Sequence, residues 1–352
     1  MRFAGSMRIE RFRAEDEPRA QACYEIFLAT RAVDDPDVPP MSRRVFGGLL
    51  KTGWVGDPRE TWLLADDGAI QGWYMLELPA RDNRHLGGLD IAVRPERRRR
   101  GFGTALLRHA ATRAVADGRR LLTGYALAGT AGEAFARAAG ATGGQTEIRR
   151  AMDTKTIPAE RIRSLLAVTE RASAGYSLVS WTAPTPEEYL DQVAAINRAL
   201  YDAPHDPSIE EPVWDAARII ATDRRTRLMG VRAHTVAARH DASGELGGLT
   251  LVEVSPERPE WGFQALTAVS RAHRGHRLGL RLKLAMLELL ASQEPQVSRI
   301  LTSNSETNEH MISINETLGY YVLGKPARSW ELPAARAEGV EGVEGVEGFP
   351  QS

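Results

Sequence analysis

Two short segments of the chain combine arginine and glycine in a pattern that can bind phosphate. One runs from Arg98 to Gly103 and reads RRRGFG, and the other runs from Arg274 to Gly279 and reads RGHRLG. Each follows an apolar run and precedes a stretch with apolar residues at helical spacing. A helix N-terminus presents unpaired N–H groups and partial positive charge, and glycine lets a ligand approach the backbone closely. Both segments therefore predict a site for a phosphate or pyrophosphate, to which the arginines add charge-assisted contacts.

The spacing of the two segments indicates an internal duplication. Arg98 and Arg274 are 176 residues apart, and so are Gly103 and Gly279. A repeat of this size predicts two similar domains. One position departs from the repeat, because Arg277 stands where the first segment has Gly101.

Length and composition agree with a two-domain protein. The 352 residues are too many for one ordinary core and suit two domains of roughly 150 to 180 residues each. The formal net charge is -1, so no general polyanion-binding field is expected. The single cysteine, Cys23, excludes an intrachain disulfide, and no apolar run reaches the length of a membrane span. The N-terminus lacks the apolar core of a signal peptide, and we expect a cytoplasmic protein.

Strand and helix patterns follow the same order in both halves. From Met7 the order is strand, two helices, three strands, helix, strand, helix and strand, and a nearly identical order begins at Tyr176 and closes with one strand over 320–332. We therefore expect a first domain over 1–155, a linking helix over 156–175 and a second domain over 176–333. The repeated Glu, Gly and Val near the end predict a disordered tail over 334–352.

The spacing Arg98-x-x-Gly101-x-Gly103, together with this element order, resembles the pyrophosphate loop of the GCN5-related N-acetyltransferases (GNAT). The resemblance covers roughly residues 7 to 333. It implies an α/β (α+β) fold with two tandem acyl-CoA N-acyltransferase domains, each a mixed central sheet flanked by helices. The second half looks like those of tandem acetyltransferases of high-GC bacteria. Mycothiol synthases share this two-domain plan, although no close match to their acceptor-binding residues is present.

The resemblance assigns a set of residues in each half to acyl-CoA. In the first half Ile91 and Val93 would face the pantetheine arm, and the pyrophosphate residues would be Arg98, Arg99, Arg100, Gly101, Phe102, Gly103 and Thr104. In the second half Thr267 and Val269 would face the arm, and the pyrophosphate residues would be Arg274, Gly275, His276, Arg277, Leu278, Gly279 and Leu280. Asn308 would contact CoA or, alternatively, cap the helix that follows it.

Direct acyl transfer needs a base for the acceptor ammonium and often an acid for the leaving thiolate. Many family members use a tyrosine as this acid, but its position holds Asn315 here and Phe135 or Ala136 in the first half. Tyr320 is the substitute that we select, and a packed aromatic residue is the alternative. Tyr321 is a further possibility.

The predicted base is Glu253, which lies on the strand before the motif strand, where an acceptor amine is expected. A solvated strand glutamate is the alternative. His85 and Asp90 are the first-half equivalents. We assign His273 and His276, which flank the second loop, to contact with phosphate or solvent.

The predicted function is the transfer of an acetyl or other acyl group from acetyl-CoA, or another acyl-CoA, to a primary amine of a small molecule, with catalysis in the second half. One alternative is an aminoacyl-tRNA or longer acyl-CoA donor, and another is a non-catalytic CoA-binding sensor or scaffold. No residues have metal-ligand spacing, so no metal is expected. We expect no membrane partner, and a monomer or homodimer.

Overall fold

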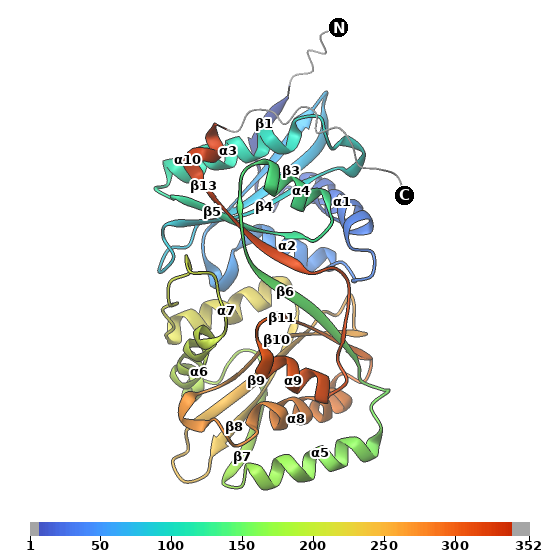
Figure 1. Ribbon diagram of the computed structural model, residues 1–352, viewed down its shortest axis with the longest axis vertical. Helices are drawn as coiled ribbons and strands as arrows, with labels where there is room; N and C mark the ends of the chain where they lie inside the picture. The colour runs from blue at the N-terminus through green and yellow to red at the C-terminus, as the bar shows by residue number, and fades with distance from the viewer. Residues whose placement is uncertain (1–6, 340–352) are drawn as a thin grey trace.

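One continuous sheet of thirteen strands runs through both halves of the chain (Figure 1). The computed structural model describes residues 7–339. The strand order is β1-β2-β3-β4-β5-β13-β6-β11-β10-β9-β8-β7, and β12 pairs with β6 outside this path. The expected fold class, a mixed sheet flanked by helices in two tandem domains, is confirmed.

The elements of the first half occur in the expected order. They are β1 (Arg8–Arg11), α1 (Glu17–Asp34), α2 (Arg43–Lys51), β2 (Arg59–Asp66), β3 (Ala69–Glu77), β4 (Leu86–Val93), α3 (Phe102–Ala116), β5 (Leu121–Leu127), α4 (Ala131–Ala138) and β6 (Thr142–Asp153). A helix in the linking range, α5 (Ala159–Ala172), packs on α8 of the second half through Ile162, Leu165 and Leu166.

The second half repeats this order. Its elements are β7 (Tyr176–Thr182), α6 (Leu190–Arg198), the short 3-10 helix η4 (Ala199–Asp202), α7 (Ala216–Met229), β8 (Arg232–His240), β9 (Leu246–Val254), β10 (Trp261–Val269), α8 (Leu278–Gln293), β11 (Arg299–Ser305), α9 (Glu309–Thr317), β12 (Tyr321–Val322), β13 (Ala327–Pro333) and α10 (Ala334–Glu338).

The two halves exchange strands. β13, the last strand within the described residues, lies between β5 and β6, with Trp330 in register with Gly124 on one side and Gly143 on the other. β6 in turn pairs with β11 over Glu147–Asp153, from Arg299 opposite Asp153 to Ser305 opposite Glu147. Figure 1 shows red β13 reaching into the first half and green β6 running down to the second. Each half therefore depends on the other for the continuity of its sheet.

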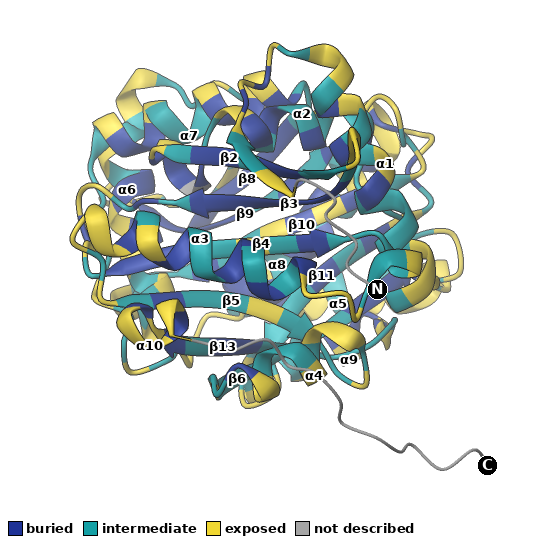
Figure 2. Cartoon of the chain, turned by 90° about the horizontal axis from the view of Figure 1, so that it is seen from above, coloured by how far each residue is buried: buried dark blue, intermediate teal, exposed yellow. Residues whose placement is uncertain are grey.

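Helices cover both faces of the sheet because the strand residues alternate between the faces. In β3, Trp73 and Met75 pack toward α1 and α2, whereas Tyr74 and Leu76 pack toward α3. The second half uses the same alternation, with α6 on one face and α8 on the other. In Figure 2 the buried residues concentrate on the strands and on the inward helix faces.

The end of the chain differs from expectation. The single strand expected over 320–332 divides into β12 and β13, because Gly324 has a φ of 70° and Pro326 offers no N–H to a ladder. The tail expected from residue 334 begins instead with α10, whose Ala334 and Ala337 are fully buried and pack on α3. The rest of the expected tail, residues 340–352, lies outside the described residues.

None of the helices within residues 7–339 is long and apolar enough to cross a membrane.

Candidate functional site

A cavity of about 1240 Å³ opens where the parallel strands β10 and β11 part. They pair only over Trp261–Phe263 and Arg299–Leu301, so the following residues of β10 have an open edge on the β11 side. A register shift between Gln264 and Leu266 marks a bulge at the start of this open edge. Strands of the first half and residues between Ala199 and Trp214 form the opposite wall, so the cavity lies between the two halves.

Most of the cofactor residues predicted for the second half gather at this cavity. The lining includes Thr267, Val269, Arg274, Gly275, Arg277, Leu278, Gly279, Leu280 and Asn308, whereas His276 is not part of it. Asn308 is also the N-cap of α9, because its Oδ1 accepts from the Met311 N–H at 3.2 Å.

The two arginine-glycine loops follow the same backbone path. In the first loop Arg99 and Gly101 have φ values of 62° and 79°, and in the second Gly275 and Arg277 have 90° and 54°. The left-handed conformation thus occurs at matching positions of the repeat: Arg99 corresponds to Gly275, and Gly101 corresponds to Arg277. Arg277 therefore preserves the turn, at a backbone cost of about 1–2 kcal/mol.

The second loop carries an ion pair at the expected pyrophosphate position. Arg274 Nη2 lies 2.6 Å from Asp202 Oδ2, and Arg271 pairs with the same carboxylate. Hydrogen bonds from Arg271 and then Arg274 lower the pKa of Asp202 to about 2. A pyrophosphate bound at the start of α8 would compete with Asp202 for Arg274.

The first loop does not line this cavity. Arg98 binds Asp34 of α1 through two hydrogen bonds of 2.9 and 2.6 Å, which leaves its guanidinium paired within the protein. A Cβ on Gly103 would lie 3.4 Å from the Phe135 ring of α4. Ile91 and Val93, the residues predicted to face pantetheine, pack against the same first-half core as Phe135.

The other first-half candidates lie apart from this loop. His85 Nε2 is 3.0 Å from the Ser208 carbonyl oxygen, so this ring contacts the second half, and Asp90 lies exposed on β4.

Glu253 and Tyr320, the predicted base and acid, both lie outside the cavity lining. Glu253 is half-buried on β9, in register with Phe263. Burial raises the pKa of its carboxyl, and the opposing effect of Arg225 is smaller. Tyr320 is buried, and its hydroxyl donates to Gln264 Oε1 at 3.3 Å. Burial raises the pKa of this phenol. Tyr320 thus reaches the cavity wall through Gln264.

A buried polar network at the bulge of β10 was not identified from the sequence. Lys283 of α8 is 3% exposed and lines the cavity, and its Nζ donates to Gln264 Oε1 at 2.7 Å and to Asn315 Oδ1 at 2.9 Å. Gln264 Nε2 donates to Thr250 Oγ1 at 2.6 Å, and Asn315 Nδ2 donates to Asn304 Oδ1 at 2.7 Å. One signal was available: Lys283, one of four lysines in the chain, interrupts the apolar segment LRLKLAML.

The cavity wall opposite β10 carries an aromatic ring from the first half and a carboxylate from each half. Tyr125 of β5 is 64% exposed and lines this space. Desolvation by the cavity walls, followed by the negative charges of Glu147 and Asp206, raises the pKa of its hydroxyl to about 12. Glu147 accepts from Ser303 at 2.8 Å, and Asp206 accepts from Ser329 at 2.6 Å. This side of the cavity is therefore suited to a cationic or amine-bearing molecule.

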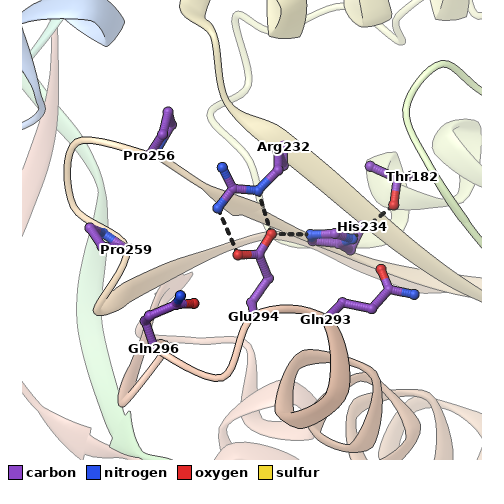
Figure 3. A pocket seen from close by; sticks show the side chains of 8 residues that line it. All are labelled: Thr182, Arg232, His234, Pro256, Pro259, Gln293, Glu294 and Gln296. Carbon is purple, nitrogen blue, oxygen red and sulfur yellow. Dashed lines mark hydrogen bonds and ion pairs between the residues drawn. The ribbon is translucent and has the colours of Figure 1, made fainter.

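A smaller pocket of about 580 Å³ lies at the start of β8, beside the C-terminal end of α8 (Figure 3). Its central carboxylate, Glu294, binds Arg232 at 2.5 and 2.6 Å and His234 at 2.8 Å, and the other nitrogen of His234 is 3.0 Å from Thr182 Oγ1. Since these polar groups bind one another, the cluster joins α8 to β8.

No group of three or more His, Cys, Asp and Glu side chains suited to a metal ion occurs within residues 7–339, and the expectation of no metal stays a prediction.

Comparisons with known proteins agree with this architecture. Residues 20–131 match the acetyltransferase (GNAT) family model. A tandem GNAT protein from the clavulanic acid biosynthesis pathway is 27% identical, with a TM-score of 0.78 over 94% of this chain and 99% of that chain. A GCN5-related N-acetyltransferase from Sphaerobacter thermophilus, 14% identical with a TM-score of 0.64 over 93% of this chain and 96% of that one, shares the fold. No curated protein matches the chain.

Proposed function

We propose that the second half of this chain, a tandem N-acyltransferase of the GNAT family, transfers an acyl group, acetyl in the simplest case, from CoA to a primary amine of a small molecule. The acceptor nitrogen attacks the thioester carbonyl carbon, the carbon–sulfur bond breaks, and CoA leaves as a thiol. We also expect the enzyme to work in the cytoplasm.

One observation carries this proposal: all the residues assigned to CoA in the second half except His276 line a single cavity that begins at the open edge of β10. In the proposed complex the pyrophosphate binds at the start of α8, with Gly279 and the N–H groups of the first turn beneath it. The arm then runs along β10, whose edge between Thr267 and Val269 is not paired with β11 and can provide backbone hydrogen bonds.

The acceptor amine would enter along the wall opposite β10, to which both halves contribute. Tyr125, Glu147 and Asp206 offer a ring face and two carboxylates to a cation there. In this arrangement the first half contributes Tyr125 and Glu147 to the acceptor wall and receives the exchanged strand β13 from the second half. We propose that its own loop, with Arg98 paired to Asp34, has a structural role.

A matched pair of variants tests which loop binds CoA. Gly279→Glu and Gly103→Glu each introduce a carboxylate at a helix start. The steric surroundings are similar, because a Cβ at position 279 would lie 3.2 Å from Ile314 and a Cβ at position 103 would lie 3.4 Å from Phe135. We expect Gly279→Glu to weaken acetyl-CoA binding at least tenfold by calorimetry and to abolish acyl transfer. Gly103→Glu should retain turnover.

Opposite results for the two variants would assign catalysis to the first half. A wild-type protein that binds neither acetyl-CoA nor CoA at millimolar concentration would refute both the enzyme and the CoA-sensor alternative. If the wild-type protein binds acetyl-CoA but none of the amines tested causes release of CoA, the result would favour the sensor.

The aminoacyl-tRNA alternative receives its own test. A gel shift with tRNA at physiological salt that is lost in the Arg97→Glu, Arg99→Glu double variant would support that donor in place of acyl-CoA.

A further inference from the structure

The polar network around Lys283 occurs in one half only. At the repeat distance of 176 residues, Leu107 corresponds to Lys283 and Gly88 to Gln264. Leu107 is 4% exposed and belongs to the first-half core. A lysine buried at an equivalent helix position is therefore not required by the fold, and its desolvation is costly unless it has a role.

The location of Lys283 matches the place where a thioester would arrive. The pyrophosphate loop follows Val269, and Gln264 lies five residues earlier on β10, a span of roughly 17 Å at the rise of an extended strand. This span is comparable with an extended pantetheine arm. Because Nζ lies 2.7 Å from Gln264 Oε1, Lys283 would be beside the reacting end of an acyl-CoA whose pyrophosphate binds at the start of α8.

The hydrogen bonds of Lys283 suit both of its protonation states. An ammonium has three N–H groups, and among the described residues two oxygens accept from Nζ, those of Gln264 and Asn315. The third N–H remains available to a group in the cavity. After loss of that proton, a neutral amine keeps both hydrogen bonds and presents a lone pair in the same direction.

We propose that Lys283 is a catalytic residue of the acyl transfer, the acid that gives the departing CoA sulfur its proton. The acceptor nitrogen forms a bond to the thioester carbonyl carbon, the carbon–sulfur bond breaks, and its electron pair stays on sulfur, which takes a proton from Nζ. The proton that the new amide nitrogen loses restores the Lys283 ammonium, directly or through cavity water. This proposal rests on the acyl transfer proposed for the second half.

The surroundings of Lys283 support this role. Burial lowers the pKa of its ammonium to about 7, with no contribution from a neighbouring charge. The other titratable group packed against it is Tyr320 after α9, whose ring centre lies 5.1 Å from Nζ and whose own pKa is raised by burial. Gln264 of β10 and Asn315 of α9 are neutral. Lys283 is therefore the group of this network that can exchange a proton near neutral pH.

The test uses three substitutions of Lys283 in the full-length chain. Lys283→Met removes the nitrogen, Lys283→Gln keeps N–H donors for Gln264 and Asn315 without a titrating group, and Lys283→Arg keeps a permanent charge. Lys51→Met on the exposed end of α2 is the control. The probes are acetyl-CoA with glucosamine, spermidine and 2-phenylethylamine, and slow acetyl-CoA hydrolysis if none of these is acetylated. Released CoA thiol gives the rate, and calorimetry gives the acetyl-CoA Kd.

We expect each Lys283 variant to lower kcat by about 10² to 10⁴ while acetyl-CoA Kd changes less than threefold. Because the acid must be protonated, wild-type kcat should fall as pH rises through about 7, and this limb should be absent in Lys283→Gln. Lys51→Met should match the wild type.

Two results would overturn the role of Lys283 but would not contradict the proposed acyl transfer. One is a folded Lys283→Gln variant whose kcat and pH profile equal those of the wild type. The other is a Lys283→Arg variant with the kcat of the wild type, which would show that the site needs a fixed positive charge and not a proton donor. A wild-type protein that releases no CoA thiol under any condition would instead overturn the proposed acyl transfer, and the lysine proposal with it.

Discussion

Leu332 offers a direct test of the strand exchange. It lies on β13, near the end of the chain, yet it is 5% exposed and belongs to the first-half core with Leu107 and Leu122. Because β13 is held by β5 on one side and β6 on the other, the strand is not free to collapse onto the space that Leu332→Ala leaves. We expect the free energy of unfolding to fall by about 3 kcal/mol, within the 2–5 kcal/mol that buried leucine truncations cost.

The location of the damage is more informative than its size. Urea unfolding measures the loss, and hydrogen exchange with mass spectrometry locates it. Leu332→Ala should increase exchange in residues 121–127 of β5, about 200 positions earlier in the sequence. The matched control, Leu290→Ala on α8, is 2% exposed in the second-half core and should increase exchange around β9 and β10 instead. Unchanged protection of residues 121–127 in Leu332→Ala would refute the exchange.

Three further outcomes follow from ion pairs. Asp202→Asn frees Arg274 for pyrophosphate and should strengthen acetyl-CoA binding a few-fold in calorimetry at low salt; equal or weaker binding would contradict the competition. Arg218→Met leaves the buried carboxylate of Asp82 unpaired and should lower the free energy of unfolding by about 3–5 kcal/mol in urea, whereas a loss below about 1 kcal/mol would show that the pair is dispensable. Burial raises the pKa of Asp82, but hydrogen bonds, first from Arg218 and then from Val213, outweigh it, and the pKa in the folded protein is lowered. The pair therefore contributes to the free energy of unfolding above the pKa of an unfolded aspartate, near 3.9, and this contribution is lost as pH falls through the lower pKa of the folded protein. Acid titration of unfolding should therefore show a smaller loss below about pH 4 in Arg218→Met than in the wild type.

The sequence predicted the order of the elements in both halves because apolar periodicity and turn residues are local. It did not predict the partners of β13, since a strand with alternating residues can pair with any open edge. The segment Gly324 to Pro326 breaks the expected strand, and only the three-dimensional structure reveals that the following residues cross to β5.

The candidate site was predictable to a similar degree. The loop at Arg274 to Leu280 carries a sequence pattern, and these residues, His276 excepted, line the cavity. Lys283 carries no pattern, because its role depends on Gln264 and Asn315, which lie 19 positions before it and 32 positions after it. The roles of Glu253 and Tyr320 stay predictions.

The position of β13 has a consequence for synthesis of the protein. A ribosome finishes β6 at Asp153, but the strand that lies between β5 and β6 begins only at Ala327. At typical bacterial or eukaryotic elongation rates this interval lasts roughly 10 to 35 s. During that time the nascent first half has an unfilled gap in its sheet, with strand edges that are open to wrong partners. Correct assembly of the first half must therefore await the synthesis of Ala327–Pro333.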